Sequence, residues 1–381
     1  MKTKVFAAIL IMMLLCMSSL FMTEAAAFPE TRKDAVVKYV LSLQVDKGGF
    51  KSFSNDQPNI KATFEALYIL DLLGKLGKIK KNKIVEWINE TLIVSDETSK
   101  DYGLIRDKPN GEANIYSIYF GLQTFSILNK DYTEYLDQEY VINWVMKCNA
   151  DTVFSIRPNS TEKAIWTTYY AFSIIYILNS TLLTQLGPNI TNWLVTLQNP
   201  DGGFSLNNNI SSLAETYATI KILSLLGQIQ NSGIDIERLK SWVLERMLPD
   251  GSFEELPGSG SGSLFTIYLA INILNDLDAL QQLGENKSKV IEWILSCQRS
   301  SGGFGLLNST TEESIASGEA TMEATFYAVS TLHLLDPELS SLAEKPWWGL
   351  PLGLPLHIWL LLITVVIVIV LMAIHVKFRK I

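Results

Sequence analysis

The sequence contains only three cysteines and three histidines among its 381 residues, which leaves few ligands for a zinc or similar metal site. Positive charge is also scarce, because 31 Lys and Arg are outnumbered by 39 Asp and Glu, for a net charge of −8 at pH 7. This balance argues against a protein that binds nucleic acid through a basic surface. Disorder is ruled out, since 48% of the residues are hydrophobic and only 18% are charged. We expect no cofactor and no metal ion.

Residues 356–376 contain no Asp, Glu, Lys or Arg and are long enough to cross a bilayer as a helix. The stretch predicts a transmembrane helix. Three basic residues in the tail that follows, residues 377–381, predict that this end lies in the cytoplasm. Proline and glycine recur in residues 341–355, which predicts a linker between this helix and the body of the protein.

Residues 1–27 have the organisation of a secretory signal peptide, with two early lysines, an apolar run and three alanines at residues 25–27. An uncleaved anchor is the alternative. Both ends together predict a single-pass protein of the cell membrane whose body lies outside the cytoplasm. Seven Asn-x-Ser/Thr sequons agree with that compartment, and we expect several to be glycosylated. They are Asn89, Asn159, Asn179, Asn189, Asn209, Asn286 and Asn308.

An aromatic residue followed by an apolar residue recurs six times in the body of the chain, with steps of 48, 57, 49, 49 and 51 residues. The six are Tyr39, Trp87, Trp144, Trp193, Trp242 and Trp293. Three of the units continue with Gly-Gly-Phe, at residues 48–50, 202–204 and 302–304, and residues 250–253 are a degenerate fourth copy. A fixed period of this length indicates a repeated supersecondary unit.

A run of apolar residues with helical spacing follows each Gly-rich turn or its equivalent. The runs cover residues 62–73, 115–128, 165–178, 213–226, 264–277 and 324–335. Each unit is therefore predicted to be an outer helix, a turn and a buried inner helix. Six such hairpins over residues 28–340 predict an all-α fold, and we favour a closed (α/α)6 toroid over an open solenoid.

The Leu-Gln-x-x-x-Gly-Gly-Phe unit resembles the repeat of prenyltransferases and squalene cyclases, over nearly all of residues 36–335. The nearest local resemblance is to protein prenyltransferase β-subunits. Residues 103–109 resemble their Gly-Leu-x-Asp-Lys-Pro-Gly loop, and residues 119–122 resemble the helix that carries their zinc-binding histidine. The resemblance implies an α/α toroid, a fold that hosts several functions.

The zinc ligands that this resemblance implies are missing. Aligned on the loop, the family's Asp, Cys and His positions correspond to Asn59, Lys61 and Ser117, and a lysine ammonium repels a metal ion. Alignment on the last two repeats also finds no ligand, because the positions then fall near Gly262, Leu264 and Ala324. The acid motif of class II terpene cyclases has only a partial match, at residues 276–279.

The first turns of the predicted inner helices converge on the axis of the ring, where aromatic and charged side chains predict a ligand cavity. The candidate residues are Lys61, Tyr116, Ser117, Tyr119, Trp166, Tyr170, Tyr268 and Tyr327. Glu215 and Glu323 are weak candidates for a catalytic acid–base pair. Two alternatives remain open: the aromatic residues as core filling, and the glutamates as carboxylates favoured at helix starts.

Two classes of function follow. The first is a membrane-tethered, non-catalytic toroid that binds an apolar or isoprenoid ligand, such as a lipid, or a protein partner at the surface. The second is an enzyme of the prenyltransferase or terpene-cyclase type with a non-standard active site. The missing zinc ligands favour the first class.

Overall fold

The computed structural model describes residues 31–150, 152–161, 164–207, 210–307 and 319–344. The predicted signal peptide, transmembrane helix, cytoplasmic tail and most of the linker lie outside these residues, as do Asn209 and Asn308. Among the helices that are described, none is both long and apolar enough to cross a membrane.

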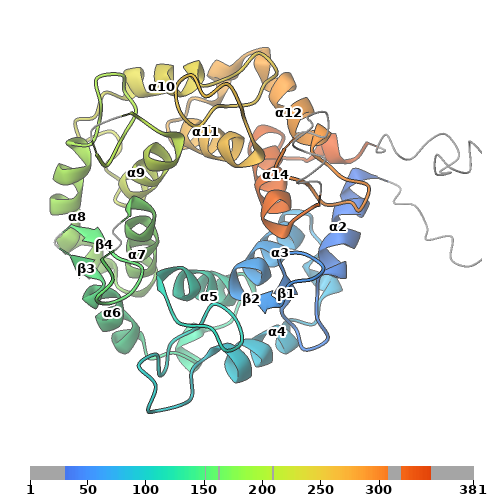
Figure 1. The fold of residues 1–381 in the computed structure, drawn as a ribbon, viewed down its shortest axis with the longest axis vertical. Coiled ribbons are helices and arrows are strands. Elements are labelled where there is room, and N and C mark those ends of the chain that lie inside the picture. The colour runs from blue at the N-terminus through green and yellow to red at the C-terminus, as the bar shows by residue number, and fades with distance from the viewer. Residues whose placement is uncertain (1–30, 151, 162–163, 208–209, 308–318, 345–381) are drawn as a thin grey trace, which may run out of the picture. The chain divides into compact units, whose positions relative to one another are not determined.

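Alternating outer and inner helices form a ring over residues 36–341 (Figure 1). The outer helices are α2 (Arg32–Ser42), α4 (Lys81–Trp87), α6 (Gln138–Lys147), α8 (Ser180–Val195), α10 (Ile236–Glu245) and α12 (Asn286–Ser296). The inner helices are α3 (Ile60–Leu72), α5 (Ile115–Ile127), α7 (Ile165–Leu178), α9 (Leu213–Leu225), α11 (Leu264–Asp276) and α14 (Met322–Leu335). Each inner helix packs against the next, and α14 packs against α3. The predicted toroid is confirmed.

The fold is not purely α-helical, because two of the connections between outer and inner helices contain short antiparallel strand pairs. These are β1 (Phe50–Lys51) with β2 (Pro58–Asn59), and β3 (Asn149–Ala150) with β4 (Val153–Phe154). Phe50 lies opposite Asn59, and Asn149 lies opposite Phe154. A π-helical segment, η2 (Ile88–Leu92), extends α4, and the short 3-10 helices are η1 (Leu76–Lys78), η3 (Tyr132–Glu134), η4 (Leu280–Leu283) and η5 (Ser340–Leu342).

Polar side chains define where the inner helices begin. In five of the inner helices, the side chain of the residue just before the helix accepts a hydrogen bond from a backbone N–H of the first turn. This N–H has no acceptor within the helix itself. These capping residues are Asn59, Asn114, Ser212, Ser263 and Thr321. Because the residues that follow are apolar on most faces, each inner helix is stable only where it is covered by its outer helix and its two neighbours.

The Gly-Gly-Phe turns fix three of the inner helices, α3, α9 and α14, against their outer helices. Gly202 has a φ of 103°, which glycine adopts without the steric cost that other residues carry. Phe204 is fully buried, and its N–H donates to Thr216 Oγ1 of α9 at 3.0 Å. The same bond recurs in three other repeats, from Phe50 to Thr63, Phe154 to Thr168 and Phe304 to Thr325.

The second glycine of these turns packs against an aromatic residue of the following outer helix. A Cβ atom at Gly203 would lie only 2.6 Å from Trp242 Cε2. At Gly303, in the last repeat, the aromatic neighbour is Tyr39 of α2, whose hydroxyl also donates to the Ala320 carbonyl at 2.6 Å. The last repeat therefore contacts the first in the same way as consecutive repeats contact each other.

Candidate functional site

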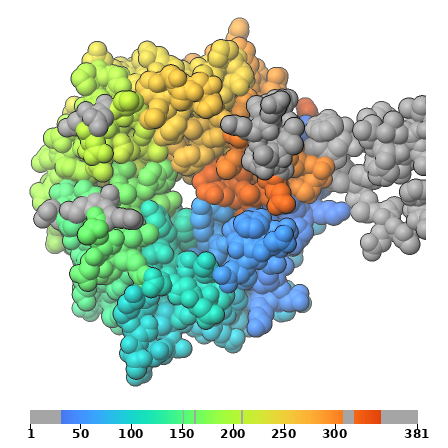
Figure 2. Space-filling view, viewed as in Figure 1, coloured from blue at the N-terminus to red at the C-terminus, as the bar shows by residue number. Residues whose placement is uncertain are grey.

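A cavity of about 750 Å³ occupies the axis of the ring, and Figure 2 shows the surface hollowed there. Ligand pockets are typically 300–1,000 Å³. The six inner helices occupy equivalent places in their repeats. Residues at equivalent helix positions therefore reach the cavity at the same height along the axis of the ring. The fifth residue of every inner helix is aromatic and lines the cavity. These residues are Phe64, Tyr119, Tyr169, Tyr217, Tyr268 and Phe326.

These six residues form a closed aromatic girdle, the name we keep for them. Around the ring, each contacts the next, with centroid separations from 5.8 Å for Tyr217 and Tyr268 to 6.5 Å for Tyr119 and Tyr169. Separations of about 4.5–7 Å are typical of favourable aromatic pairs. Further aromatic residues line the cavity around the girdle: Tyr68, Tyr116, Phe120, Trp166, Tyr170, Phe265 and Tyr327.

Charged residues from the first turns of α3 and α14 meet on one side of the cavity. Lys61 Nζ donates to Glu323 Oε1 at 2.6 Å, and the Tyr327 hydroxyl donates to the same oxygen at 2.6 Å. Glu65, one turn after Lys61, places Oε1 3.7 Å from the same ammonium. We call these four residues the Lys61 cluster.

Burial determines the charges in the Lys61 cluster. Glu65 is only 3% exposed, and burial raises its pKa to about 8, a shift that Lys61 opposes and Glu323 reinforces. Burial also disfavours charge on Lys61 and Glu323. Glu65 and Glu323 nevertheless keep the pKa of Lys61 above its usual value, and Lys61 and the Tyr327 hydroxyl keep the pKa of Glu323 below its usual value. At neutral pH the cluster therefore holds one ammonium, one carboxylate and one protonated carboxyl group.

A second ion pair lies further along the inner helices. Lys221 of α9 lines the cavity, with Nζ 2.9 Å from Asp276 Oδ2 of α11 and 5.5 Å from the centroid of the Tyr217 ring. Both side chains of this pair are largely buried, at 20% and 11% exposure. The cavity thus has an ion pair on each side of an aromatic girdle.

The structure brings nearly all of the candidates named from sequence to this one cavity. They are Lys61, Tyr116, Ser117, Tyr119, Trp166, Tyr170, Tyr268, Tyr327 and Glu323. Glu215 is the exception. It is the third residue of α9, about 100° around the helix from the second, and its Oε2 accepts a hydrogen bond from the Leu206 N–H at 3.1 Å. The suggested pairing of Glu215 with Glu323 is therefore corrected, because the two do not share the cavity.

Sequence reasoning missed Glu65, Tyr169, Tyr217 and Lys221, all of which line the cavity. Glu65 carried a readable signal, since it follows Lys61 by four residues, and side chains at that spacing share one helix face. Tyr169 and Tyr217 occupy the same helix position as Tyr119 and could have been found by aligning the six inner helices on their first residues.

The positions that correspond to zinc ligands in the β-subunits do not fit a metal ion. Asn59 caps α3 by accepting the Ala62 N–H at 2.8 Å, and the Ser117 hydroxyl donates to the Ile105 carbonyl at 2.7 Å. Lys61, at the third position, is a cation in an ion pair. Across the described part of the chain, no three His, Cys, Asp or Glu residues are grouped so that they could hold a metal.

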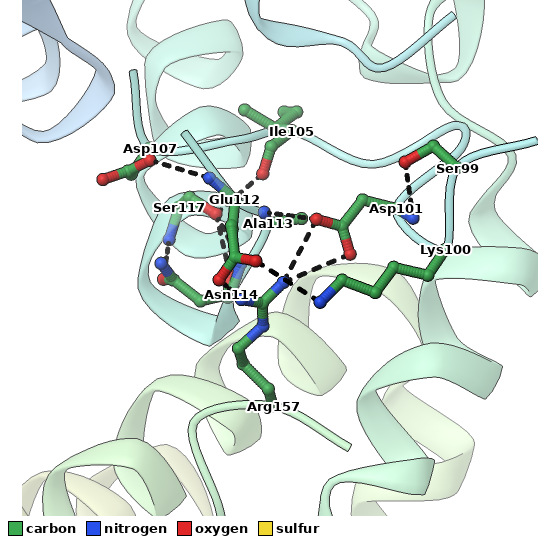
Figure 3. Close-up of polar contacts among 10 residues, drawn as sticks. All are labelled: Ser99, Lys100, Asp101, Ile105, Asp107, Glu112, Ala113, Asn114, Ser117 and Arg157. Atoms are coloured by element: carbon green, nitrogen blue, oxygen red, sulfur yellow. Dashed lines mark hydrogen bonds and ion pairs between the residues drawn. The ribbon is translucent and has the colours of Figure 1, made fainter. Parts of the chain in front are cut away.

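The loop that resembles the β-subunit loop is held by an ionic network (Figure 3). Asp101 accepts a hydrogen bond from the Ala113 N–H at 3.0 Å and binds Arg157 Nη2 through both oxygens, at 3.1 and 3.3 Å. Arg157 also pairs with Glu112. Because Arg157 belongs to the next repeat, this network joins the loop before α5 to the loop before α7.

Five of the predicted glycosylation sites lie in the described residues. Asn89, Asn159 and Asn189 are exposed, and Asn179 and Asn286 are partly exposed. Their use as glycan acceptors stays a prediction.

Comparison with known proteins identifies the family. Residues 6–162 and 157–349 match the model of the prenyltransferase alpha-alpha toroid domain. The geranylgeranyl transferase type-2 β subunit of Saccharomyces cerevisiae is 29% identical over 228 residues, which are 57% of this chain and 66% of that protein. The type-1 β subunit of Arabidopsis thaliana is 33% identical over 135 residues, 35% of this chain and 33% of that protein. The chain thus spans less than two thirds of the length of either relative.

Solved structures show the same fold. Candida albicans protein geranylgeranyltransferase-I complexed with GGPP has a TM-score of 0.59 and 17% identity, covering 74% of this chain and 85% of that one. The type II terpene cyclase MstE from Scytonema has a TM-score of 0.51 and 14% identity, covering 80% of this chain and 96% of that one. With the repeats, the closed ring and the family match in agreement, the chain belongs to the prenyltransferase α/α toroid family.

Proposed function

We propose that this protein binds an elongated apolar ligand of the isoprenoid type in the axial cavity, without transferring it to another molecule. The observation that carries the proposal is the closed aromatic girdle within a cavity of about 750 Å³. An apolar chain inside the girdle would contact aromatic rings on all sides, and burial contributes roughly 25 cal/mol per Å² of apolar surface. A relative of the same fold is complexed with GGPP, which agrees in ligand type.

The proposal includes a location. Residues 1–27, residues 356–376 and the sequons support a protein tethered to the cell membrane with the ring outside the cytoplasm. We favour a small apolar ligand over a surface protein partner, because the aromatic side chains line an internal cavity.

The test compares two tyrosines of one helix. Tyr170 lines the cavity and contacts Tyr119 at a centroid distance of 4.7 Å, whereas Tyr176 is 53% exposed and does not line it. We expect the purified full chain to bind geranylgeraniol one to one in equilibrium dialysis. Tyr170→Ala should weaken binding at least tenfold, or about 1.4 kcal/mol, and Tyr176→Ala less than twofold. No binding by the folded wild-type chain would refute the proposal.

Acid catalysis on the bound chain is the second candidate function, and Glu65 is the observation that favours it. Its raised pKa keeps the carboxyl group protonated at neutral pH beside an apolar cavity. Proton transfer from Glu65 to a carbon of a ligand double bond would form a C–H bond and leave a carbocation and a carboxylate. Loss of a neighbouring proton to that carboxylate would give an isomeric alkene and restore the acid.

Mass spectrometry distinguishes this candidate from simple binding. If Glu65 is a catalytic acid, incubation of geranylgeraniol with the wild-type chain in deuterated water should give isomers that contain deuterium. Glu65→Gln, which cannot donate a comparable proton, should reduce their formation at least 100-fold. Recovery of unchanged, unlabelled geranylgeraniol from the wild-type chain would exclude the enzymatic role for this ligand.

A further inference from the structure

Resting on the proposed binding of an isoprenoid chain, we propose that the cavity selects a ligand with an uncharged polar end group and rejects a diphosphate. Glu323 enforces this selection by neutralising Lys61. The selection acts on the end group of the ligand alone, because the girdle contacts the apolar part of the ligand.

The first step is the charge of the cavity wall. Its basic residues, among those described, are Lys61, Lys108 and Lys221, and it contains no arginine. Its acidic residues are Asp56, Glu65, Asp107 and Glu323. A diphosphate carries at least two negative charges and is bound in proteins by groups of unpaired cations or by bidentate arginine. The wall offers no such group.

The second step is the state of each lysine. The Lys61 ammonium donates to Glu323 at 2.6 Å, and Lys221 pairs with Asp276 at 2.9 Å. An anion placed at either lysine would meet the carboxylate that already binds it, at a distance where like charges repel strongly in a partly buried site. Lys108 is exposed on the loop before α5, where water screens its charge.

The third step is what the Lys61 cluster can still offer. An ammonium has three N–H donors, and one of those of Lys61 is directed to Glu323. The carboxyl group of Glu65 faces the cavity 3.7 Å from the same nitrogen. A hydroxyl or carbonyl group can accept from Lys61, and a hydroxyl can also donate to Glu65, with no change in the charge of the site. An alcohol, aldehyde or similar end group therefore fits.

The test uses two ligands with the same isoprenoid group, geranylgeraniol and geranylgeranyl diphosphate. Equilibrium dialysis of the full-length protein at pH 7 should give a dissociation constant at least tenfold lower for the alcohol than for the diphosphate. Glu323→Gln removes the carboxylate nearest to Lys61 in a side chain of nearly the same shape and leaves Glu65, 3.7 Å away, as the acidic neighbour of Lys61. It should shift the ratio of the two dissociation constants at least tenfold toward the diphosphate. The double variant Lys61→Met, Glu323→Gln should not show that shift, because it has no ammonium group at position 61 to bind the diphosphate.

The outcomes separate this inference from the proposed function. Tighter binding of the diphosphate by the wild-type chain would overturn the inference and leave isoprenoid binding intact. A folded Glu323→Gln variant with an unchanged ratio would also overturn it, since Glu323 would then not control selection. Failure of the folded wild-type chain to bind either compound would refute isoprenoid binding itself. If Glu323→Gln does not fold, as judged by circular dichroism, the wild-type ratio still decides.

Discussion

Replacement of Gly203 by valine is expected to lower the free energy of unfolding by about 3 kcal/mol or more. A Cβ atom there would lie 2.5 Å from Ser211 Cβ and 2.6 Å from Trp242 Cε2, both in the packed layer between turn and outer helix. Trp242 cannot move away without opening the contact between consecutive repeats, and Ser211 is fully buried. Urea denaturation followed by circular dichroism measures the change.

Gly77→Val is the matched control, because a Cβ atom at this exposed glycine has no atom within 4 Å and needs no unusual φ. It should change stability by less than about 1 kcal/mol. Whatever fraction of Gly203→Val remains folded should keep the ligand preference of the wild-type chain, since these turns are structural. If Gly203→Val is as stable as the wild-type protein but no longer binds geranylgeraniol or its diphosphate, the turn is a binding element instead.

A rise in pH from 5 to 8 is expected to destabilise the protein, with Glu65 as the main cause. Burial raises the pKa of Glu65 from its usual 4.5 to about 8. Between these two values the folded protein binds more protons than the unfolded chain, so stability falls by up to ~1.4 kcal/mol per pH unit. The stabilisation is complete below about pH 4.5 and lost as the pH passes 8. Lys61, Glu323, Tyr170 and Tyr327 face the same group.

Glu65→Gln should remove most of this pH dependence, because an amide does not ionise. Urea denaturation at pH 5, 6, 7 and 8 measures it, and the difference in stability between variant and wild type should widen steadily with pH. Glu97→Gln, at an exposed glutamate, should follow the wild-type curve. Parallel curves for wild type and Glu65→Gln would mean that Glu65 is ionised throughout, and both the acid role and the charge assigned to the Lys61 cluster would then be wrong.

The ring could be predicted from sequence because it rests on residues that stability requires in every repeat. Tyr39, Trp242 and their equivalents pack between repeats, and the turn glycines allow that packing. The spacing between such residues in the sequence equals the length of one repeat. The two strand pairs were missed because each strand has only two residues, too few for an alternating pattern.

The charged residues of the site were predicted less completely because, unlike the aromatic girdle, they do not repeat in type. Glu65 and Lys221 lie in mostly apolar helices that contain only one or two other charged residues, and the periodicity of the apolar residues hides them. Glu215 was grouped with Glu323 because both are near a helix start, yet one is the third residue and the other the second. A difference of one position rotates a side chain by about 100° and removes it from the axis. Which carboxylate meets Lys61 is decided by ring closure, not by the local sequence.

The ion pair of Lys61 and Glu323 joins residues that are 262 positions apart in the chain. During synthesis, α3 leaves the ribosome long before α14, so Lys61 has no partner until nearly the whole body has been made. The Lys61 cluster is therefore among the last features to form, because it needs contacts of very high sequence separation, which are slow to establish. A chain that stops before α14 lacks Glu323 and Tyr327, so its Lys61 cluster is incomplete. Under the proposed function, binding of the isoprenoid ligand would then require a finished ring.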